Sequence, residues 1–162
     1  IAGGNNRQTL TLEDGEAREL LQKWSEEAGM TMKVDELGSM FLKREGTDKN
    51  ALPVVIGSHL DTQPTGGKYD GVLGVLAGLE IVRTLNDLNI QTKHPIMIVN
   101  WTNEEGSRFP PAMMASAGYA GIYDVETLLS AEDAEGNIFG EELEKIGWKG
   151  SEPVGEQKIH SY

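Results

Sequence analysis

The chain contains no cysteine in its 162 residues. A disulfide framework and a thiolate metal site are therefore both excluded. Any metal ion that this chain holds must be bound by histidine, aspartate, glutamate or water. The missing residue type thus restricts a candidate metal site to nitrogen and oxygen ligands.

Basic residues are scarce as well. The sequence has 14 Lys and Arg against 26 Asp and Glu, which gives a net charge of −12. A surface that binds phosphate groups is basic, so nucleic acid is not expected as a partner. The acidic balance is typical of a solvated protein surface.

Long apolar runs are also missing. No segment approaches the roughly 20 apolar residues of a membrane span, and no signal-peptide pattern opens the chain. We therefore expect a cytoplasmic protein without a membrane partner, long enough for one domain with its own core. The sequence begins at Ile1 without an initiator Met and ends in an apparent strand at Lys158–Tyr162. Both features indicate a piece of a longer protein.

The most informative stretch is the apolar run at residues 54–56, which ends in Gly-Ser-His59-Leu-Asp61. A run of β-branched residues predicts a strand that is buried on both faces, as in a parallel sheet. If the extended geometry continues, His59 and Asp61 lie on one face, where a carboxylate would orient an imidazole ligand. A Gly-rich loop then brings Asp70 to the start of an apolar helix.

The remaining elements follow from periodicity and from turn residues. The spacing of apolar side chains predicts helices after Thr11, stopped by Gly29, and after Asp70. The expected strands are a hairpin at residues 30–34 and 39–44, the run from residue 54, and residues 96–99; short helices are expected at residues 110–114, 125–130 and 141–146, with an acidic loop at 131–137. This order predicts an α/β layer structure with a largely parallel sheet, in which ligands bind beyond the carboxyl ends of the strands.

Polar clusters follow both central strands at that position. His59 and Asp61 follow the first, and Glu104 and Glu105 follow the second, with Asp70 between them. Carboxylates close together raise one another's pKa unless a cation intervenes, so one or two divalent ions would make the cluster tolerable. One of the adjacent glutamates would bind the metal and the other would act as a general base toward water.

Each of these patterns alone has a structural alternative. A His-x-Asp sequence is more often structural, a glutamate pair is more often solvated charge, and an Asp-Gly before a helix is often an N-cap. His94 is expected in a surface turn without a role, and a structural role is the simpler interpretation of His160. The conjunction of three clusters at one expected edge favours a metal site.

Three blocks of the sequence resemble the signature blocks of the amidase/hydantoinase/carbamoylase family: residues 57–62 (GSHLDT), 66–71 (GGKYDG) and 103–109 (NEEGSRF). The family is a branch of the dinuclear zinc peptidase superfamily, and it includes N-carbamoyl-L-amino-acid hydrolases, β-ureidopropionases and allantoate amidohydrolases. The resemblance implies a three-layer sandwich with a largely parallel central sheet between helices. The short link between Asp61 and Asp70 favours this branch over the peptidases.

The resemblance also implies roles for the candidate residues. His59 resembles a ligand of one metal ion, Asp70 the carboxylate that bridges two, and Glu105 a ligand of the other. Glu104 resembles the general base, and Asp61 the acid that orients His59. The implied cofactors are two divalent ions, most simply zinc, while a site of this type also accepts manganese, cobalt or nickel.

The same resemblance implies what the chain lacks. Two further histidine ligands, the end of the catalytic domain and a lid domain that mediates dimerisation would lie beyond Tyr162. Residues 1–162 are then the N-terminal part of the catalytic metallohydrolase domain, in a full-length protein expected to be a homodimer. The implied reaction is hydrolysis of the carbamoyl C–N bond of N-carbamoyl-L-amino acids or related ureido acids, and the piece itself is not expected to turn over substrate. The alternatives are a peptidase or N-acyl-amino-acid deacylase of the same superfamily, or a non-catalytic binding module with this fold.

Overall fold

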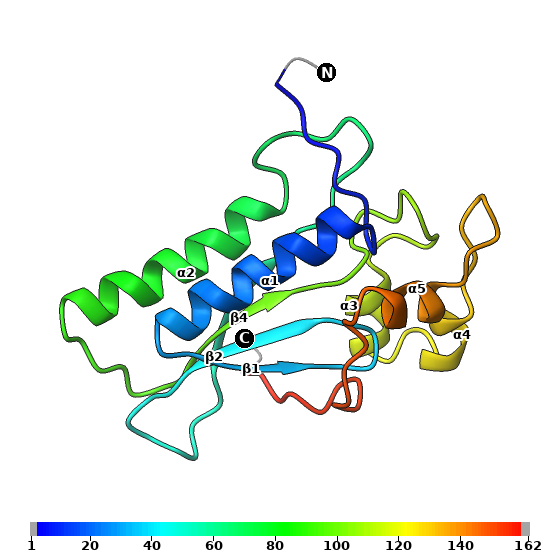
Figure 1. The fold of residues 1–162 in the computed structure, drawn as a ribbon. Helices are drawn as coiled ribbons and strands as arrows, with labels where there is room; N and C mark the ends of the chain where they lie inside the picture. The colour runs from blue at the N-terminus through cyan, green and yellow to red at the C-terminus, as the bar shows by residue number, and fades with distance from the viewer. Residues whose placement is uncertain (1–2, 160–162) are drawn as a thin grey trace.

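A computed structural model describes residues 3–159 of the chain (Figure 1). In this part of the chain a four-stranded sheet, ordered β1-β2-β4-β3, lies beneath two long helices. The elements are α1 (Leu12–Glu27), β1 (Thr31–Val34), β2 (Met40–Arg44), β3 (Val54–Ser58), α2 (Val72–Asp87), β4 (Ile96–Asn100), α3 (Met114–Tyr119), α4 (Val125–Leu129) and α5 (Phe139–Lys145).

The pairing of the strands corrects the expectation of a largely parallel sheet. β3 and β4 are parallel, whereas β1–β2 and β2–β4 are antiparallel. A parallel pair needs a crossover connection, and α2 provides it between β3 and β4. β1 and β2 are joined by the short loop at residues 35–39, which allows only a hairpin. The predicted α/β class is therefore confirmed, with a mixed sheet.

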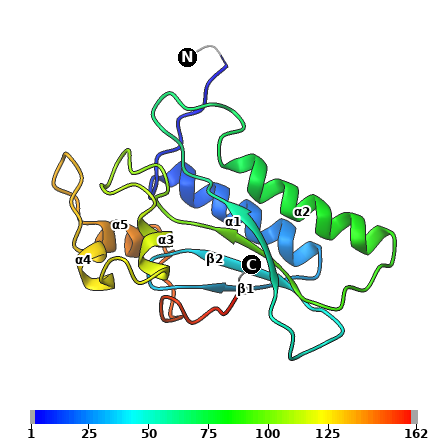
Figure 2. The same cartoon turned by 180° about the vertical axis from the view of Figure 1, so that it is seen from behind.

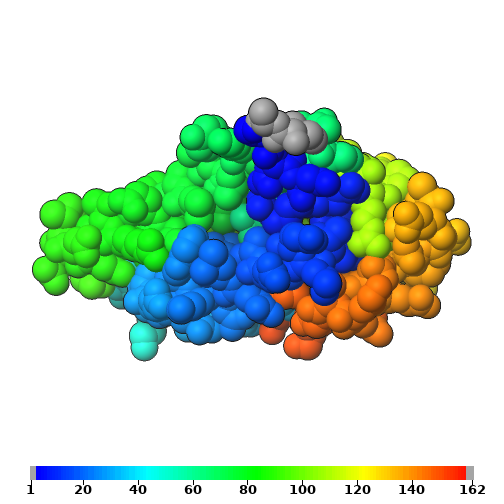
Figure 3. Space-filling view, turned by 45° about the horizontal axis from the view of Figure 1, so that its top comes forward, coloured from blue at the N-terminus to red at the C-terminus, as the bar shows by residue number. Residues whose placement is uncertain are grey.

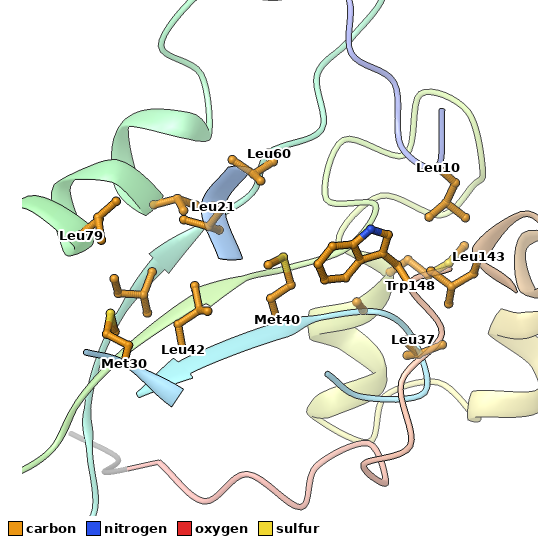
Figure 4. Close-up of a cluster of buried hydrophobic side chains, with 14 of the residues drawn as sticks. Leu10, Leu21, Met30, Leu37, Met40, Leu42, Leu60, Leu79, Leu143 and Trp148 are labelled. Atoms are coloured by element: carbon orange, nitrogen blue, oxygen red, sulfur yellow. The ribbon is translucent and has the colours of Figure 1, made fainter. Parts of the chain in front are cut away.

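The main core lies between one face of the sheet and the two long helices, which run side by side in Figures 1 and 2. Met40 and Leu42 of β2 point into this layer, and Figure 4 shows Leu21 of α1 and Leu79 of α2 above them. All four side chains are buried. Burial of one such side chain stabilises the fold by about 1.5–3 kcal/mol.

The opposite face of the sheet carries a smaller cluster of Phe41, Met97 and Val99. Tyr119 of α3 and Ile159 pack against this cluster. The described residues thus form two clear layers out of the three expected, because α1 and α2 share one face.

β3 is an edge strand, which corrects the prediction that it is buried on both faces. It pairs with β4 on one side, and Val54, Val55 and Ile56 are only partly buried within residues 3–159. The fully buried strand is β4, which lies between β2 and β3. Strand neighbours are set by contacts distant in sequence, so an apolar run alone does not identify the central strand.

Both long helices form as predicted. Thr11 caps α1, its side-chain oxygen accepting the N–H of Asp14 at 3.3 Å, and Gly29 follows the helix at a φ of +77°. In α2, Gly74 and Gly78 face β3 and β4, where an added Cβ would lie 2.8 Å from Ser58 and 3.0 Å from Ile98. These glycines let the helix approach the sheet closely.

The shorter elements agree with the prediction, except that one helix begins later in the chain than expected. The hairpin, the strand at 96–100, α4, α5 and the loop between α4 and α5 agree with the expectation. The helix expected at residues 110–114 instead begins at Met114, because the preceding loop folds back and the N–H of Met113 donates to the oxygen of Glu104 at 2.6 Å. Figure 3 shows α1 in blue between α2 in green and the α4–α5 region in yellow to orange.

Lys158 and Ile159 are not in a strand, and the rest of the predicted terminal strand, with His160, lies outside the described residues. Among residues 3–159, the structure contains no helix with the length and apolar character that crossing a bilayer requires.

Candidate metal centre

The candidate residues meet where the parallel pair ends. Ser58 of β3 pairs with Asn100 of β4, and the N–H of Trp101 donates to the oxygen of Ser58 at 2.9 Å. The two chains then leave the sheet at the same edge, one into His59 and the other toward Glu104. Carboxyl ends of parallel strands are the usual ligand-binding edge of α/β sheets.

Leu60 anchors the loop that carries His59. Its side chain is 4% exposed and points into the main core (Figure 4). Its N–H donates to Oδ1 of the buried Asn100 at 2.8 Å. β3 ends at Ser58, so the neighbours of Leu60 are positioned by these two contacts and not by a continued strand.

His59 is oriented by a main-chain group. Its Nδ1 lies 2.8 Å from the carbonyl oxygen of Asp61 and 3.6 Å from Oδ1 of the same residue. A carbonyl only accepts, so Nδ1 is a protonated nitrogen of the ring, and Nε2 is the nitrogen that faces the candidate site. Nε2 lies 3.3 Å from Oε2 of Glu104 and 3.9 Å from Oδ1 of Asp70.

The carboxylate of Asp61 holds the neighbouring loop. Oδ1 accepts the N–H of Glu104 at 3.2 Å, and Oδ2 accepts the N–H of Glu105 at 3.1 Å. Burial, with a smaller contribution from the nearby Asp14, raises the pKa of Asp61 to about 6 despite the lowering effect of the two N–H groups and of His59. Asp61 thus links the two loops that carry the candidate ligands.

Asp70 reaches the site from the start of α2. The N-cap position is Gly71, and within the described residues no side chain caps this helix, so the Asp70 carboxylate is 57% exposed and available to a ligand. Gly71 has a φ of +68°, and an added Cβ would overlap the imidazole of His59. The glycine therefore lets the helix start pass directly beside the candidate ligand.

The glutamate pair lies in a strained turn. Asn103 has a φ of +54°, a conformation that Asn tolerates better than most residues, and its Nδ2 donates to the oxygen of Phe109 at 2.7 Å. Below it, the buried guanidinium of Arg18 donates to Oγ1 of Thr102 at 3.2 Å. The turn directs the N–H groups of Glu104 and Glu105 toward Asp61.

Three of the predicted ligands come together in this arrangement. One ligand atom from each of His59, Asp70 and Glu105 lies within 4.8 Å of the other two. Oε1 of Glu105 is buried and has no hydrogen-bond partner in residues 3–159. A buried carboxylate oxygen without a partner is costly, and a cation would satisfy it.

The donor set fits a divalent ion. An imidazole nitrogen with carboxylate oxygens is a normal donor set for zinc and for related divalent ions. Four acidic side chains, from Asp61, Asp70, Glu104 and Glu105, surround one imidazole. The geometry and the negative charge therefore both favour a cation here.

Several contacts of the site were not expected from the sequence. Nε2 of Gln63 donates to Oε2 of Glu105 at 3.0 Å. Arg7 and Thr62 exchange hydrogen bonds: Arg7 N–H donates to Oγ1 of Thr62, and Thr62 N–H donates to the oxygen of Arg7, each at 2.7 Å. Gln63 directly follows the His-Leu-Asp-Thr block, and this position could have indicated that it lies near the site. Arg7 lies far from all three blocks in the sequence, so their spacing could not have indicated its contact with Thr62.

The sequence matches the profile described as peptidase family M20/M25/M40 over residues 55–151. It is 65% identical over 162 residues to an N-carbamoyl-L-amino-acid amidohydrolase of Rhizobium meliloti, covering 100% of this chain and 39% of the relative. It is 40% identical over 146 residues to an N-carbamoyl-L-amino acid amidohydrolase of Geobacillus stearothermophilus, covering 90% of this chain and 36% of the relative.

The fold is similar to that of solved structures. A crystal structure of an amidase of the hydantoinase/carbamoylase family from Burkholderia multivorans superimposes with a TM-score of 0.95 at 51% identity. The alignment covers 98% of this chain and 38% of that one. The chain thus spans about two fifths of the length of the curated relatives and structures that it matches.

Proposed function

Because the chain belongs to peptidase family M20/M25/M40, we propose that it forms the N-terminal part of the catalytic domain of a metal-dependent amidohydrolase. The proposed reaction of the whole protein is hydrolysis of the carbamoyl C–N bond of N-carbamoyl-L-amino acids or related ureido acids. The names of the Rhizobium and Geobacillus relatives support this substrate class. The observation that carries the proposal is the convergence of His59, Asp70 and Glu105 at one sheet edge.

In this proposal, His59, Asp70 and Glu105 would hold two divalent ions, and Asp70 would be the ligand that both ions share. Zinc is the ion that the family resemblance suggests, and manganese, cobalt or nickel are also compatible with this donor set. Nε2 of His59 faces the carboxylate of Asp70, and Oε1 of Glu105 is buried without a partner in the described residues; both observations support these assignments. Asp70 is the most exposed of the three, which suits a carboxylate shared between two ions.

A bound ion would polarise the carbamoyl oxygen and lower the pKa of a water molecule. Glu104 is proposed as the general base: it accepts a proton from the attacking water and delivers it to the leaving nitrogen as the C–N bond breaks. Its Oε2 lies 3.3 Å from Nε2 of His59, so its carboxylate is beside the candidate ligands. Asp61 positions both Glu104 and His59, through its carboxylate and its carbonyl oxygen respectively.

The rest of the protein is also part of the proposal. Two further histidine ligands, the remainder of the catalytic domain and a lid domain that mediates homodimerisation would be provided by chain outside residues 1–162. A cytoplasmic location and a small-molecule substrate complete the proposed function.

A peptidase or N-acyl-amino-acid deacylase is the second candidate, favoured by the description of the matching family. Release of amino acid by the full-length protein from N-carbamoyl-L-amino acids, from dipeptides and from N-acetyl-amino acids would distinguish the two. A non-catalytic binding module would release amino acid from none of them.

The proposal is tested first on the 162-residue chain by calorimetric titration with zinc and with manganese. We expect saturable binding, lost in His59→Ala and at least tenfold weaker in Asp70→Asn. The matched control is Asp87→Asn, which changes an exposed aspartate at the other end of α2. Equal affinity in all variants would contradict the metal assignment.

The second test uses the full-length protein. Glu104→Gln should lower kcat by a factor of about 10²–10⁴ while metal content is unchanged, because it removes the proton acceptor and no ligand. Glu126→Gln on α4 is the control. A Glu104→Gln variant with full activity would exclude Glu104 as the general base.

A further inference from the structure

The two carboxylate oxygens of Glu105 have different surroundings. Oε2 accepts a hydrogen bond from Nε2 of Gln63 at 3.0 Å. Oε1 is buried and has no hydrogen-bond partner in the described part of the chain. One oxygen is therefore engaged by the protein, and the other is left for a ligand.

The direction of this hydrogen bond follows from chemistry. An ionised carboxylate only accepts, so the amide nitrogen of Gln63, and not its oxygen, faces Glu105. An amide donor stabilises the carboxylate without adding a positive charge, which would compete with a cation at the same site. A lysine or arginine at residue 63 would form an ion pair with Glu105 and oppose metal binding.

The loop after β3 holds Glu105 at two points. Asp61 accepts its main-chain N–H at 3.1 Å, and Gln63, two residues further on, donates to its side chain. A glutamate side chain loses rotamer freedom when it is ordered, and this loss of entropy opposes binding. A partner that fixes the carboxylate before the ion arrives reduces this cost of binding.

We propose that Gln63 is a positioning residue that holds Oε2 of Glu105 and leaves Oε1 as the oxygen that binds the cation. This inference rests on the proposed function, since it concerns a ligand of the proposed metal site. Gln63 raises metal affinity through Glu105 without touching the ion. Its exposed position on the loop means that it contributes little to the fold itself.

The chain contains a matched control for this hydrogen bond. On α1, Nε2 of Gln22 donates to Oε1 of Glu26 at 2.7 Å, also in an exposed position. Both pairs join a glutamine amide to a glutamate, and only the Gln63 pair includes a candidate ligand. Gln63→Met and Gln22→Met each remove the donor and keep the length of the side chain.

The experiment measures the affinity of the 162-residue chain for zinc and for manganese by calorimetry, together with thermal unfolding of the metal-free protein. We expect Gln63→Met to weaken metal binding by a factor of about 10–100, the usual effect of losing a partner of a metal ligand. The Tm of the metal-free protein should stay within about 2 °C of the unsubstituted chain. Gln22→Met should change neither quantity. Gln63→Asn, which is one methylene too short to reach Oε2, should behave like Gln63→Met.

The outcomes separate this inference from the proposed function. If the unsubstituted chain binds metal and Gln63→Met binds it equally well, the role of Gln63 is excluded and the metal site stands. If both glutamine variants lose the same affinity, the effect is not specific to Glu105 and the inference is also overturned. If the unsubstituted chain binds neither metal, the metal site of this chain and the inference built on it are both rejected.

Discussion

His59 is bound by the main-chain oxygen of Asp61 at 2.8 Å, while the Asp61 carboxylate lies 3.6 Å away and accepts the N–H groups of Glu104 and Glu105. The carbonyl fixes the tautomer of the imidazole, and the carboxylate fixes the loop after β4. One residue thus sets the relative positions of a candidate ligand and the glutamate pair.

We expect Asp61→Asn to destabilise the chain by about 1–3 kcal/mol, because one of its two N–H partners would then face an amide NH₂ group. Metal affinity should fall as well, since Glu104 and Glu105 lose their common anchor. Urea unfolding and metal titration measure the two effects. The control is Asp124→Asn at the N-cap of α4. Asn caps a helix about as well as Asp, so we expect the free energy of unfolding to change by only a few tenths of a kcal/mol. An Asp61→Asn loss no larger than that of the control would contradict the anchoring role.

Gly71 and Gly29 provide a second pair of variants. Both have a positive φ, of +68° and +77°, but an added Cβ at Gly71 overlaps His59, whereas at Gly29 nothing lies within 4 Å. Gly29→Ala should cost about 1–2 kcal/mol from backbone conformation alone. Gly71→Ala should cost more and should also weaken metal binding by displacing the imidazole. Equal unfolding free energies and equal metal affinities in the two variants would show that His59 does not need this glycine.

The pH dependence of stability should report on Asp35. Burial raises the pKa of Asp35 from 3.8 to about 6, against two N–H donors and the charge of Arg18, while Glu36 adds to the increase. Since the folded-state pKa is above the unfolded value, the folded chain binds the proton more tightly. The stability contributed by the protonated carboxyl is fully present below about pH 4 and is lost as the pH rises through 6.

Asp35→Asn removes this titration, so the variant should gain stability relative to the unsubstituted chain between pH 4 and pH 7. The shift from 3.8 to about 6 corresponds to a gain of roughly 3 kcal/mol. Urea unfolding of both chains at several pH values measures the difference. A difference that is constant with pH would mean that Asp35 titrates alike in the folded and unfolded states.

Arg108 joins four parts of the chain. It donates to Asp133 at 3.0 Å, to the oxygen of Thr9 at 3.1 Å and to Glu142 at 2.7 Å. The three hydrogen bonds are largely shielded from solvent, so Arg108→Met should destabilise the chain by about 1.5–3 kcal/mol, the usual effect of losing hydrogen bonds to a charged group. Asp133 keeps its hydrogen bonds from Asn137, and Glu142 keeps its ion pair with Lys145. Arg83→Met on α2 is the control, and thermal or urea unfolding compares them. A loss in Arg108→Met similar to that of the control would exclude a structural role for this network.

The same network should affect acid stability. Burial raises the pKa of Asp133, but hydrogen bonds from Asn137, Glu135 and Arg108 outweigh it and lower the pKa to about 2. Because the folded-state pKa lies below the unfolded value of 3.8, this stability is present above pH 4 and is lost as the pH falls toward 2. Asp133→Asn should unfold with a weaker dependence on pH in that window. An unchanged pH profile would show that Asp133 contributes little to acid unfolding.

Local patterns in the sequence predicted the elements better than their arrangement. Apolar spacing of three and four identified α1 and α2, and two strand-like stretches at residues 30–34 and 39–44, separated by a short turn, identified the hairpin. The apolar character of residues 54–56 did not identify the edge position of β3, because β4, which comes later in the chain, takes the place between β3 and β2. Sheet order depends on contacts that no local pattern encodes.

In the candidate site, too, the sequence predicted which residues come together better than it predicted the contacts between them. The rule that ligands collect at the carboxyl ends of parallel strands was enough to group His59, Asp70 and Glu105. It was not enough to find that the carboxylate of Asp61 faces the glutamate N–H groups, or that Gln63 donates to Glu105. Those contacts depend on how the main chain is oriented in two loops. Asn103 fixes the orientation in the loop after β4, and the spacing of residues in the sequence does not reveal it.

The hydrogen bonds that build the site connect distant segments: Arg7 with Thr62 across 55 residues, and Asp61 with Glu105 across 44. Closing such long loops costs entropy, which only the contacts of the complete fold recover. The metal centre therefore depends on the complete fold and on no single segment. Whatever binds this centre binds only the folded chain, so its free energy adds to the stability of the whole domain.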